Sequence, residues 1–275
     1  MAFEKKLVAD SVVARLIEGQ GMYSLMNRSF DGLVQPGASS VDIPKLAIPV
    51  VKTAGYSLTG SDRKKGKADT TMMNVALATY SVPLAEEILA RYESNGKMIK
   101  GYIDSAVMTL QEYFDTLTLA AAQTGLGSSD RSAFAGASMA WADVIDISKR
   151  MDVNKVPKSG RVIAIDANLA AEFFGIDVVK NAISYNQNYL STGTFIQFMG
   201  MSFFITGLLS TITVSAAQKY TMVGIYGPGV AAIVSKFGDL KEAWDSVNLQ
   251  TVYDVITHFG VGLLDEKFAV VKYKP

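Results

Sequence analysis

The sequence KMIKGYIDSAVMTLQEYFDTLTLAAAQT, residues 97–124, spaces its apolar side chains three and four positions apart along its whole length. That spacing predicts an amphipathic helix with one buried face. Gly125 and Gly127 follow directly and are expected to end it. At about 1.5 Å rise per residue the helix is ~40 Å long, so we expect it to act as a strut. Its apolar face consists of Ile99, Tyr102, Ile103, Ala106, Val107, Leu110, Tyr113, Phe114, Leu117 and Ala121.

The region before this helix is extended. Residues 41–51 alternate and then continue as an apolar run containing Pro44 and Pro49, which favours an edge strand or a free ribbon. Residues 60–67, GSDRKKGK, form a polar, basic tip, and alternation resumes over residues 75–80. The pattern predicts a long two-stranded ribbon. Because a lone ribbon is marginal in water, either the rest of the chain or a neighbouring copy should cover its apolar side chains.

Further helices are expected on both sides of the strut. Residues 4–27 carry apolar side chains at helical spacing, which predicts a short amphipathic helix followed by an irregular arm. Pro83, with Glu86 and Glu87 soon after it, predicts the first turn of another helix. A third helix is predicted where apolar side chains share one side of residues 141–151.

Strands and turns dominate the rest of the chain. A strand is predicted over residues 161–165, and Asp166 is expected to cap a helix over residues 167–174. The run from Val230 to Lys236 fits a small buried helix, and the alternation from Val247 to Phe259 is the clearest strand in the chain. The residues alone therefore predict an α+β protein with an extended ribbon and a long strut helix.

The composition excludes several classes of protein. The chain has 275 residues, of which 49% are hydrophobic and 19% charged, and this is typical of a globular protein. Its 26 basic residues balance 26 acidic ones, which argues against a dedicated nucleic-acid binder and suits dense self-association. The absence of cysteine excludes disulfides and thiolate sites. The first ten residues carry Glu4, Lys5 and Lys6 but no apolar core, so a secretory signal is not expected.

One stretch requires a membrane test, because residues 181–218 carry no charge and residues 195–214 are rich in Phe, Met, Ile and Leu. A membrane-spanning helix needs ~20 mostly apolar residues. Here polar side chains interrupt the run, Gly200 and Gly207 fall where strands would turn, and the remainder favours β structure. We interpret the stretch as buried strands, with a membrane segment as the alternative.

The search for catalytic or cofactor-binding residues yields structural interpretations throughout. His258 is the single histidine, whereas metal sites of the usual type and catalytic triads need further partners. The chain contains no phosphate-binding or dinucleotide-binding glycine motif. Glu86 and Glu87 are expected at a helix end and Asp166 at a cap, and the basic run Arg63–Lys65 fits a solvated loop tip or a phosphate contact. We therefore predict no enzymatic activity and no cofactor.

The order of parts and several short motifs resemble one known family. Residues 156–165, VPKSGRVIAI, lead into the helix LAAEFF at residues 169–174, and residues 193–209 follow as a glycine-preceded hairpin. The closing stretch YDVITHFG, residues 253–260, ends on the aromatic–glycine step of a final strand. Together these features resemble the major capsid proteins of tailed bacteriophages with the Hong Kong 97 fold, and the resemblance covers nearly the whole chain.

The resemblance implies a division of the chain into four parts. Residues 1–37 correspond to an N-terminal arm and residues 38–82 to an extended loop that lies over the adjacent subunit. Residues 83–153 and 240–275 correspond to a peripheral domain with its spine helix. Residues 154–239 correspond to an axial domain, which meets its copies around five- and six-fold axes.

The resemblance also implies function, location and partners. The chain would self-assemble as hexamers and pentamers of an icosahedral shell in the virion capsid, made in the host cytoplasm and enclosing double-stranded DNA without sequence specificity. A separate scaffolding protein and a portal protein would be further partners, and no membrane would be involved. Alternatives are another phage structural protein, of the tail tube or of capsid decoration, or an integral membrane protein. The candidates for inter-subunit contact are Val41, Ile43, Leu46, Ile48, Arg63, Lys64, Lys65, Lys67, Val75 and Leu77.

Overall fold

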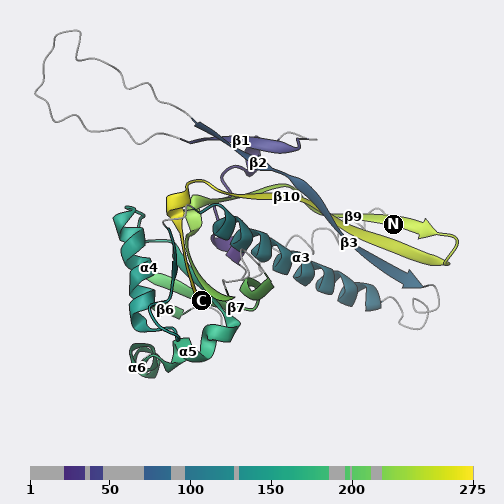
Figure 1. Ribbon diagram of the computed structural model, residues 1–275. Coiled ribbons are helices and arrows are strands. Elements are labelled where there is room, and N and C mark those ends of the chain that lie inside the picture. The colour runs from purple at the N-terminus through teal and green to yellow at the C-terminus, as the bar shows by residue number, and fades with distance from the viewer. Residues whose placement is uncertain are drawn as a thin grey trace, which may run out of the picture.

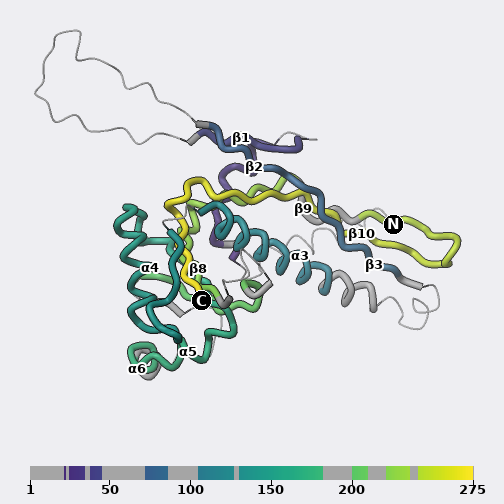
Figure 2. Tube along the Cα trace, viewed as in Figure 1, coloured from purple at the N-terminus to yellow at the C-terminus, as the bar shows by residue number. Residues whose placement is uncertain are grey.

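The described residues form three β-sheets arranged around one long helix (Figure 1). The computed structural model describes residues 22–34, 38–45, 71–87, 97–126, 130–185, 196–198, 200–211 and 219–274. Figure 2 shows a body that holds the six-stranded sheet and a narrow blade that projects from it. A two-stranded ribbon lies against the blade near its junction with the body.

The blade is a three-stranded antiparallel sheet with a helix packed on one face. Strand β10 (Gln250–Leu263) lies between β3 (Ala78–Glu87) and β9 (Val230–Asp245). Helix α3 spans Lys97–Thr124, and this confirms the predicted strut. The ring of Phe114 on this helix lies 4.2 Å, centroid to centroid, from the ring of Phe259 on β10, and both side chains are fully buried.

The prediction of a helix beginning at Pro83 is wrong. Pro83 lies within β3, opposite Asp254 of β10, and Glu86 and Glu87 continue the same strand. An edge strand can contain a residue that donates no ladder hydrogen bond, and β3 is such an edge. The proline that suited a first helical turn suits this edge equally well.

The small helix predicted from Val230 to Lys236 is also wrong, because these residues begin β9. Val230, Ala232 and Val234 are buried in the core beneath α3, while Ala231 and Ile233 are buried against the ribbon. A strand covered on both faces has a continuous apolar run without alternation. Such a run does not distinguish a strand from a buried helix.

The body is built on a mixed sheet of six strands in the order β4-β11-β8-β5-β7-β6. One face packs against α3 and the other against the helices α4, α5 and α6 (Figure 1). The strands are β4 (Arg131–Ala133), β5 (Arg161–Asp166), β6 (Ile196–Phe198), β7 (Met201–Thr206), β8 (Lys219–Tyr226) and β11 (Ala269–Lys274). The helices are α4 (Trp141–Val153), α5 (Ala170–Gly175) and α6 (Asp177–Tyr185).

Several predictions for the body are confirmed. The strand at residues 161–165 and the helix at residues 141–151 form as expected, and Asp166 Oδ1 accepts the backbone N–H of Asn168 at 2.8 Å as a cap. A 3-10 turn at Ala167–Leu169 precedes α5. Strands β6 and β7 lie in the charge-free stretch, and no helix in the described part of the chain is long and apolar enough to span a membrane.

The division into parts that the resemblance implied stays a prediction. Residues 131–153 and 269–274 were assigned with the strut helix, but they supply β4, α4 and β11 to the body. Chain order does not reveal which sheet a strand joins, and β11 returns to the body after β10 has run along the blade. The remaining short 3-10 turns are Met22–Leu25, Asp31–Leu33, Leu208–Thr211, Gly227–Gly229 and Glu266–Phe268.

The contact between α3 and β10 predicts a large loss of stability when its ring is removed. Phe114→Ala should lower the free energy of unfolding by about 3–5 kcal/mol, because it leaves a cavity in a close-packed core. Met108 lies on the same helix and is 70% exposed, so Met108→Ala should change that free energy by no more than about 0.5 kcal/mol. Urea unfolding of the purified chain measures both, and equal losses would contradict the described packing.

Candidate assembly surfaces

The ribbon lies on its own chain at its base. Strands β1 (Ser40–Lys45) and β2 (Thr71–Ala76) pair antiparallel, with Val41 opposite Val75. The inward-facing side chains pack against Ala231 and Ile233 on the back of β9 and are buried there. These inward-facing side chains are Val41, Ile43, Val75 and Leu77.

The assignment of those four side chains to contacts with a neighbouring subunit stays a prediction. The sequence allowed two kinds of cover for the ribbon, and at its base the cover comes from the same chain, since β9 has an apolar back face. The described outward face mixes polar side chains with the exposed Pro44, Met72 and Ala76, and Asn74 Nδ2 donates to Asp42 Oδ1 at 2.7 Å. The remaining candidates lie outside the described residues and stay predictions, namely Leu46, Ile48, Arg63, Lys64, Lys65 and Lys67.

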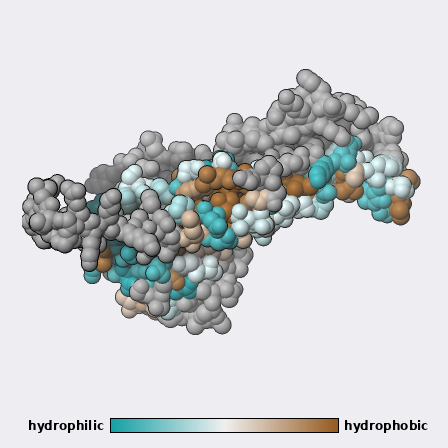
Figure 3. All heavy atoms as spheres, turned by 90° about the horizontal axis from the view of Figure 1, so that it is seen from above, coloured by the Kyte–Doolittle hydropathy of each residue, from teal (hydrophilic) through white to brown (hydrophobic). Residues whose placement is uncertain are grey.

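A second surface, at the far end of the blade, was missed by the sequence analysis. The blade tip, residues 244–249, joins β9 to β10 and exposes three large apolar side chains. Trp244 is 53% exposed, Val247 86% and Leu249 60%. Figure 3 shows apolar surface at this end of the molecule.

Hydrogen bonds to Asp245 hold the blade tip in one conformation. Oδ1 of Asp245 accepts the backbone N–H groups of Val247 at 3.0 Å and Asn248 at 3.3 Å. Its Oδ2 accepts from Asn248 Nδ2 at 2.7 Å and from Gln250 Nε2 at 3.3 Å. Leu249 has a φ of 51°, in the left-handed region that few non-glycine residues adopt. The turn is therefore a fixed platform for apolar side chains rather than a loose loop.

The turn also explains why the predicted start of the strand at Val247 was wrong. An aspartate that bonds the backbone two and three residues onward offers the chain an alternative to the strand ladder. The sequence does carry a signal for this turn, because Asp245, Ser246 and Asn248 are all turn-favouring residues. The alternation of Val247 and Leu249 with polar neighbours concealed it.

The segment 156–161, on which the family resemblance partly rested, has a local structural role. Arg161, at the start of β5, is almost fully buried, and its Nη2 lies 2.7 Å from Asp152 Oδ1 at the end of α4. The same guanidinium donates to the carbonyls of Val156 and Pro157. The hydrogen bond from Arg161 lowers the pKa of Asp152. Arg161 thus fixes the loop between α4 and β5.

Gly160 follows in the same loop and has a backbone conformation that would be strained in other residues. Its φ of 84° lies in the left-handed region, and its carbonyl accepts the N–H of Gly227 at 2.9 Å. A side chain on Gly227 would meet the carbonyl oxygen of Leu25 at 2.4 Å. The two glycines therefore allow the segment before the ribbon to pack closely against the body.

The residues considered for chemistry have structural surroundings. His258 lies on β10 with its Nδ1 3.0 Å from Thr79 Oγ1, and Glu86 and Glu87 lie in β3. Among the described residues, no three histidine, aspartate or glutamate side chains form a group that could hold a metal ion. An open hollow of about 450 Å³ on α4 is lined only by residues of that helix, so it lacks converging polar groups from several elements. The lining residues are Ile145, Ser148, Lys149, Asp152 and Val153.

No protein-family model and no curated protein sequence matches the chain. Solved structures do match over nearly its whole length. A chain from Mycobacterium phage Che8 matches with a TM-score of 0.65 at 17% identity, covering 92% of this chain and 90% of that chain. The capsid structure of the cyanophage P-SCSP1u gives a TM-score of 0.65 at 14% identity, covering 90% of this chain and 86% of that one.

This chain has the fold of capsid-shell proteins. The virus-like particle from Pyrococcus furiosus matches with a TM-score of 0.64 at 8% identity, covering 97% of this chain and 98% of that chain. The similarity thus includes body, blade and ribbon together, while little of the sequence is shared. The predicted likeness to capsid proteins is confirmed at the level of the fold.

The cap at the blade tip predicts an acid-sensitive turn. The hydrogen bonds from the Asn248 side chain and from the N–H groups of Val247 and Asn248 lower the pKa of Asp245 from its ordinary 3.8. A lowered pKa means that the cap is intact above pH 3.8 and is lost as the pH falls through the folded-state value. NMR shifts of the Val247 and Asn248 amides should therefore titrate with a midpoint below 3.8.

The matched control is Asp245→Ala, in which these two amide shifts should not follow an acidic titration. A midpoint at or above 3.8 in the unaltered chain would contradict the described cap.

Proposed function

We propose that this chain is the major capsid protein of a tailed bacteriophage, a structural subunit that self-assembles into an icosahedral shell around DNA. The observation that carries the proposal is the match in fold over nearly the whole chain, from ribbon to closing strand, with proteins of capsids and virus-like particles. If this chain merely shared one domain with those proteins, the structural match would cover only part of each chain. The virion capsid is accordingly its proposed location, and we propose no enzymatic role.

The shape of the molecule supports self-assembly. The blade projects from the body and ends in the turn that joins β9 to β10 (Figure 1), where Trp244, Val247 and Leu249 are exposed. Exposed apolar side chains on a fixed turn are typical of protein contact sites. Heterologous contacts between identical chains close into a shell when the rotation that relates them closes. Balanced charge permits many copies to pack without long-range repulsion.

In finer detail, we infer a Hong Kong 97-like arrangement. The body would be the axial domain and the blade with α3 the peripheral domain. Residues 38–82 would include the extended loop, with its base (Ser40–Lys45 and Thr71–Ala76) on its own chain and residues 46–70 over an adjacent subunit. Residues 1–37 would form the N-terminal arm. A separate scaffolding protein, a portal protein and packaged double-stranded DNA would be further partners, with the DNA contacted without sequence specificity.

Electron microscopy of the purified chain, with and without a co-expressed scaffolding partner, tests the proposal. We expect closed polyhedral particles in at least one of the two samples. Open tubes or isolated rings would instead indicate a tail protein, and a chain that stays monomeric in both samples would overturn the proposal.

The blade tip gives a sharper prediction. Val247→Asp combined with Leu249→Asp should reduce the yield of particles at least about tenfold, because burying an unpaired carboxylate in an apolar contact is strongly unfavourable. The free energy of unfolding of the subunit should change little, since both side chains are exposed in the single chain. Particle yield is measured by sedimentation and subunit stability by urea unfolding.

Met108→Asp is the matched control, since Met108 is similarly exposed on the same blade but lies on the outer side of α3. It should leave the yield within a factor of about two. Wild-type yield from the double variant would exclude the blade tip as an assembly contact.

A further inference from the structure

The last strand of the chain lies in the interior of the body sheet. Strand β11 pairs in parallel with β4 and antiparallel with β8, so it separates two strands that would otherwise have open edges. Ala269 and Val271 are buried in the core shared with α3, and Val270 is buried in the core beneath α4 and α5. Residues 269–271 therefore contribute to the hydrophobic core on each face of the body sheet.

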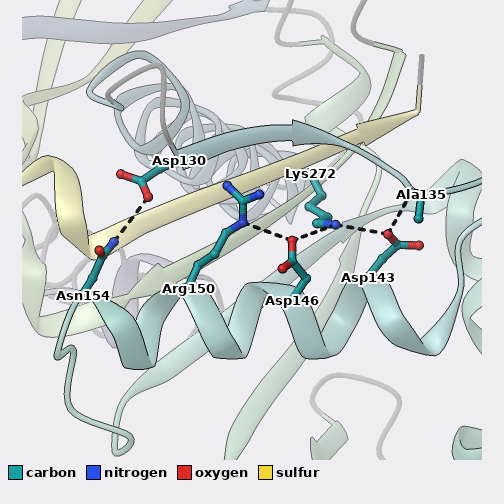
Figure 4. Close-up of polar contacts among 7 residues, drawn as sticks. All are labelled: Asp130, Ala135, Asp143, Asp146, Arg150, Asn154 and Lys272. Carbon is teal, nitrogen blue, oxygen red and sulfur yellow. Dashed lines mark hydrogen bonds and ion pairs between the residues drawn. The ribbon is translucent and has the colours of Figure 1, made fainter.

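A buried lysine joins this strand to α4. Lys272 is only 5% exposed, and its Nζ lies 3.2 Å from Asp143 Oδ1 and 2.9 Å from Asp146 Oδ2 (Figure 4). Asp146 Oδ2 also accepts from Arg150 Nε at 3.0 Å. Burial alone would raise the pKa of Asp146, but the hydrogen bonds from Lys272 and Arg150 outweigh it and hold that pKa below its usual value.

The same carboxylates hold the segment that precedes α4. Asp143, which is 1% exposed, accepts the backbone N–H groups of Ala135 at 3.2 Å and Ala140 at 3.0 Å. Asp143 thus ties residues 135–140, the start of α4 and strand β11 to one buried point.

A second lysine repeats the arrangement on α5. Lys274 Nζ lies 2.6 Å from Glu172 Oε1, and Glu172 Oε2 accepts the backbone N–H of Met139 at 2.6 Å. The hydrogen bond from Lys274 lowers the pKa of Glu172. Two lysines of one strand thus reach two different helices, and both of their partners hold the same loop.

We propose that β11 is an ionic latch that closes the α4 side of the body. A buried carboxylate without its cation is strongly unfavourable, so α4 and residues 135–140 pack stably only when β11 brings Lys272 to Asp143. The ion pairs of Lys272 and Lys274 are made with α4 and α5, whereas Ala269 and Val271 of the same strand pack in the core shared with α3. Loss of the ion pairs therefore acts first on β4, β11 and the α4 side of the sheet.

Hydrogen exchange of the full-length, unassembled chain tests the latch. Lys272→Met keeps the aliphatic length but leaves Asp143 buried without its cation. It should accelerate exchange in β4, β11 and residues 135–140 by on the order of a hundredfold, while β3 and β10 of the blade exchange as before. The double variant Lys272→Met with Asp143→Asn removes both charges and should recover most of the protection, because charge pairs in contact are not additive.

A general loss of stability would accelerate exchange in blade and body alike, and this result, like unchanged exchange in the body, would overturn the latch. If the Lys272→Met variant does not fold, the same exchange experiment is done on Lys274→Met. It should accelerate exchange only around residues 135–140 and α5, and by a smaller factor, because Lys274 and Glu172 are partly exposed. Absence of particles from the unaltered chain would contradict the proposed function but leave this exchange pattern intact.

Discussion

The first five residues of β9 hold the molecule together, because they are buried on both faces. Val230, Ala232 and Val234 complete the core beneath α3, and Ala231 and Ile233 cover the ribbon from the other side. The strand then continues along the blade, paired with β10. One strand thus fixes the position of ribbon, blade and strut helix relative to one another. In the proposed shell, where one chain would repeat many times in one geometry, any freedom at this junction would multiply over every contact.

The sequence predicted the parts whose patterns are long or chemically specific. Helix α3 was predicted with its observed bounds because its apolar period persists over seven turns, and the Asp166 cap followed from residue type and position. The strand at Pro83 and the start of β9 were missed for a common reason. Edge position and burial on both faces are tertiary properties, and each removes the local pattern by which a strand is recognised. The blade tip was missed because the hydrogen bonds of Asp245 override an alternating sequence.

The candidate contact residues show the same limit. Alternation at Val41, Ile43, Val75 and Leu77 indicated one apolar face of the ribbon, and that face exists. The residues that cover this face, Ala231 and Ile233 of β9, lie far from the ribbon in the sequence. Val247 and Leu249 at the blade tip fit the alternating pattern of a strand, so the sequence does not reveal their exposure. The exposure follows from the turn that places them at the end of the blade. The closing strand follows the same principle, since the position of β11 within the sheet cannot be read from its six residues.

The molecule therefore has a shared junction, a projecting blade with an apolar tip and a body closed by strand β11. We propose above all that the blade tip serves contacts between copies. A single-particle reconstruction of the purified assembly tests that proposal most directly. We expect a closed icosahedral shell in which residues 244–249 of every copy are buried against other copies. Particles without closed symmetry, or a shell in which those residues face solvent, would contradict it.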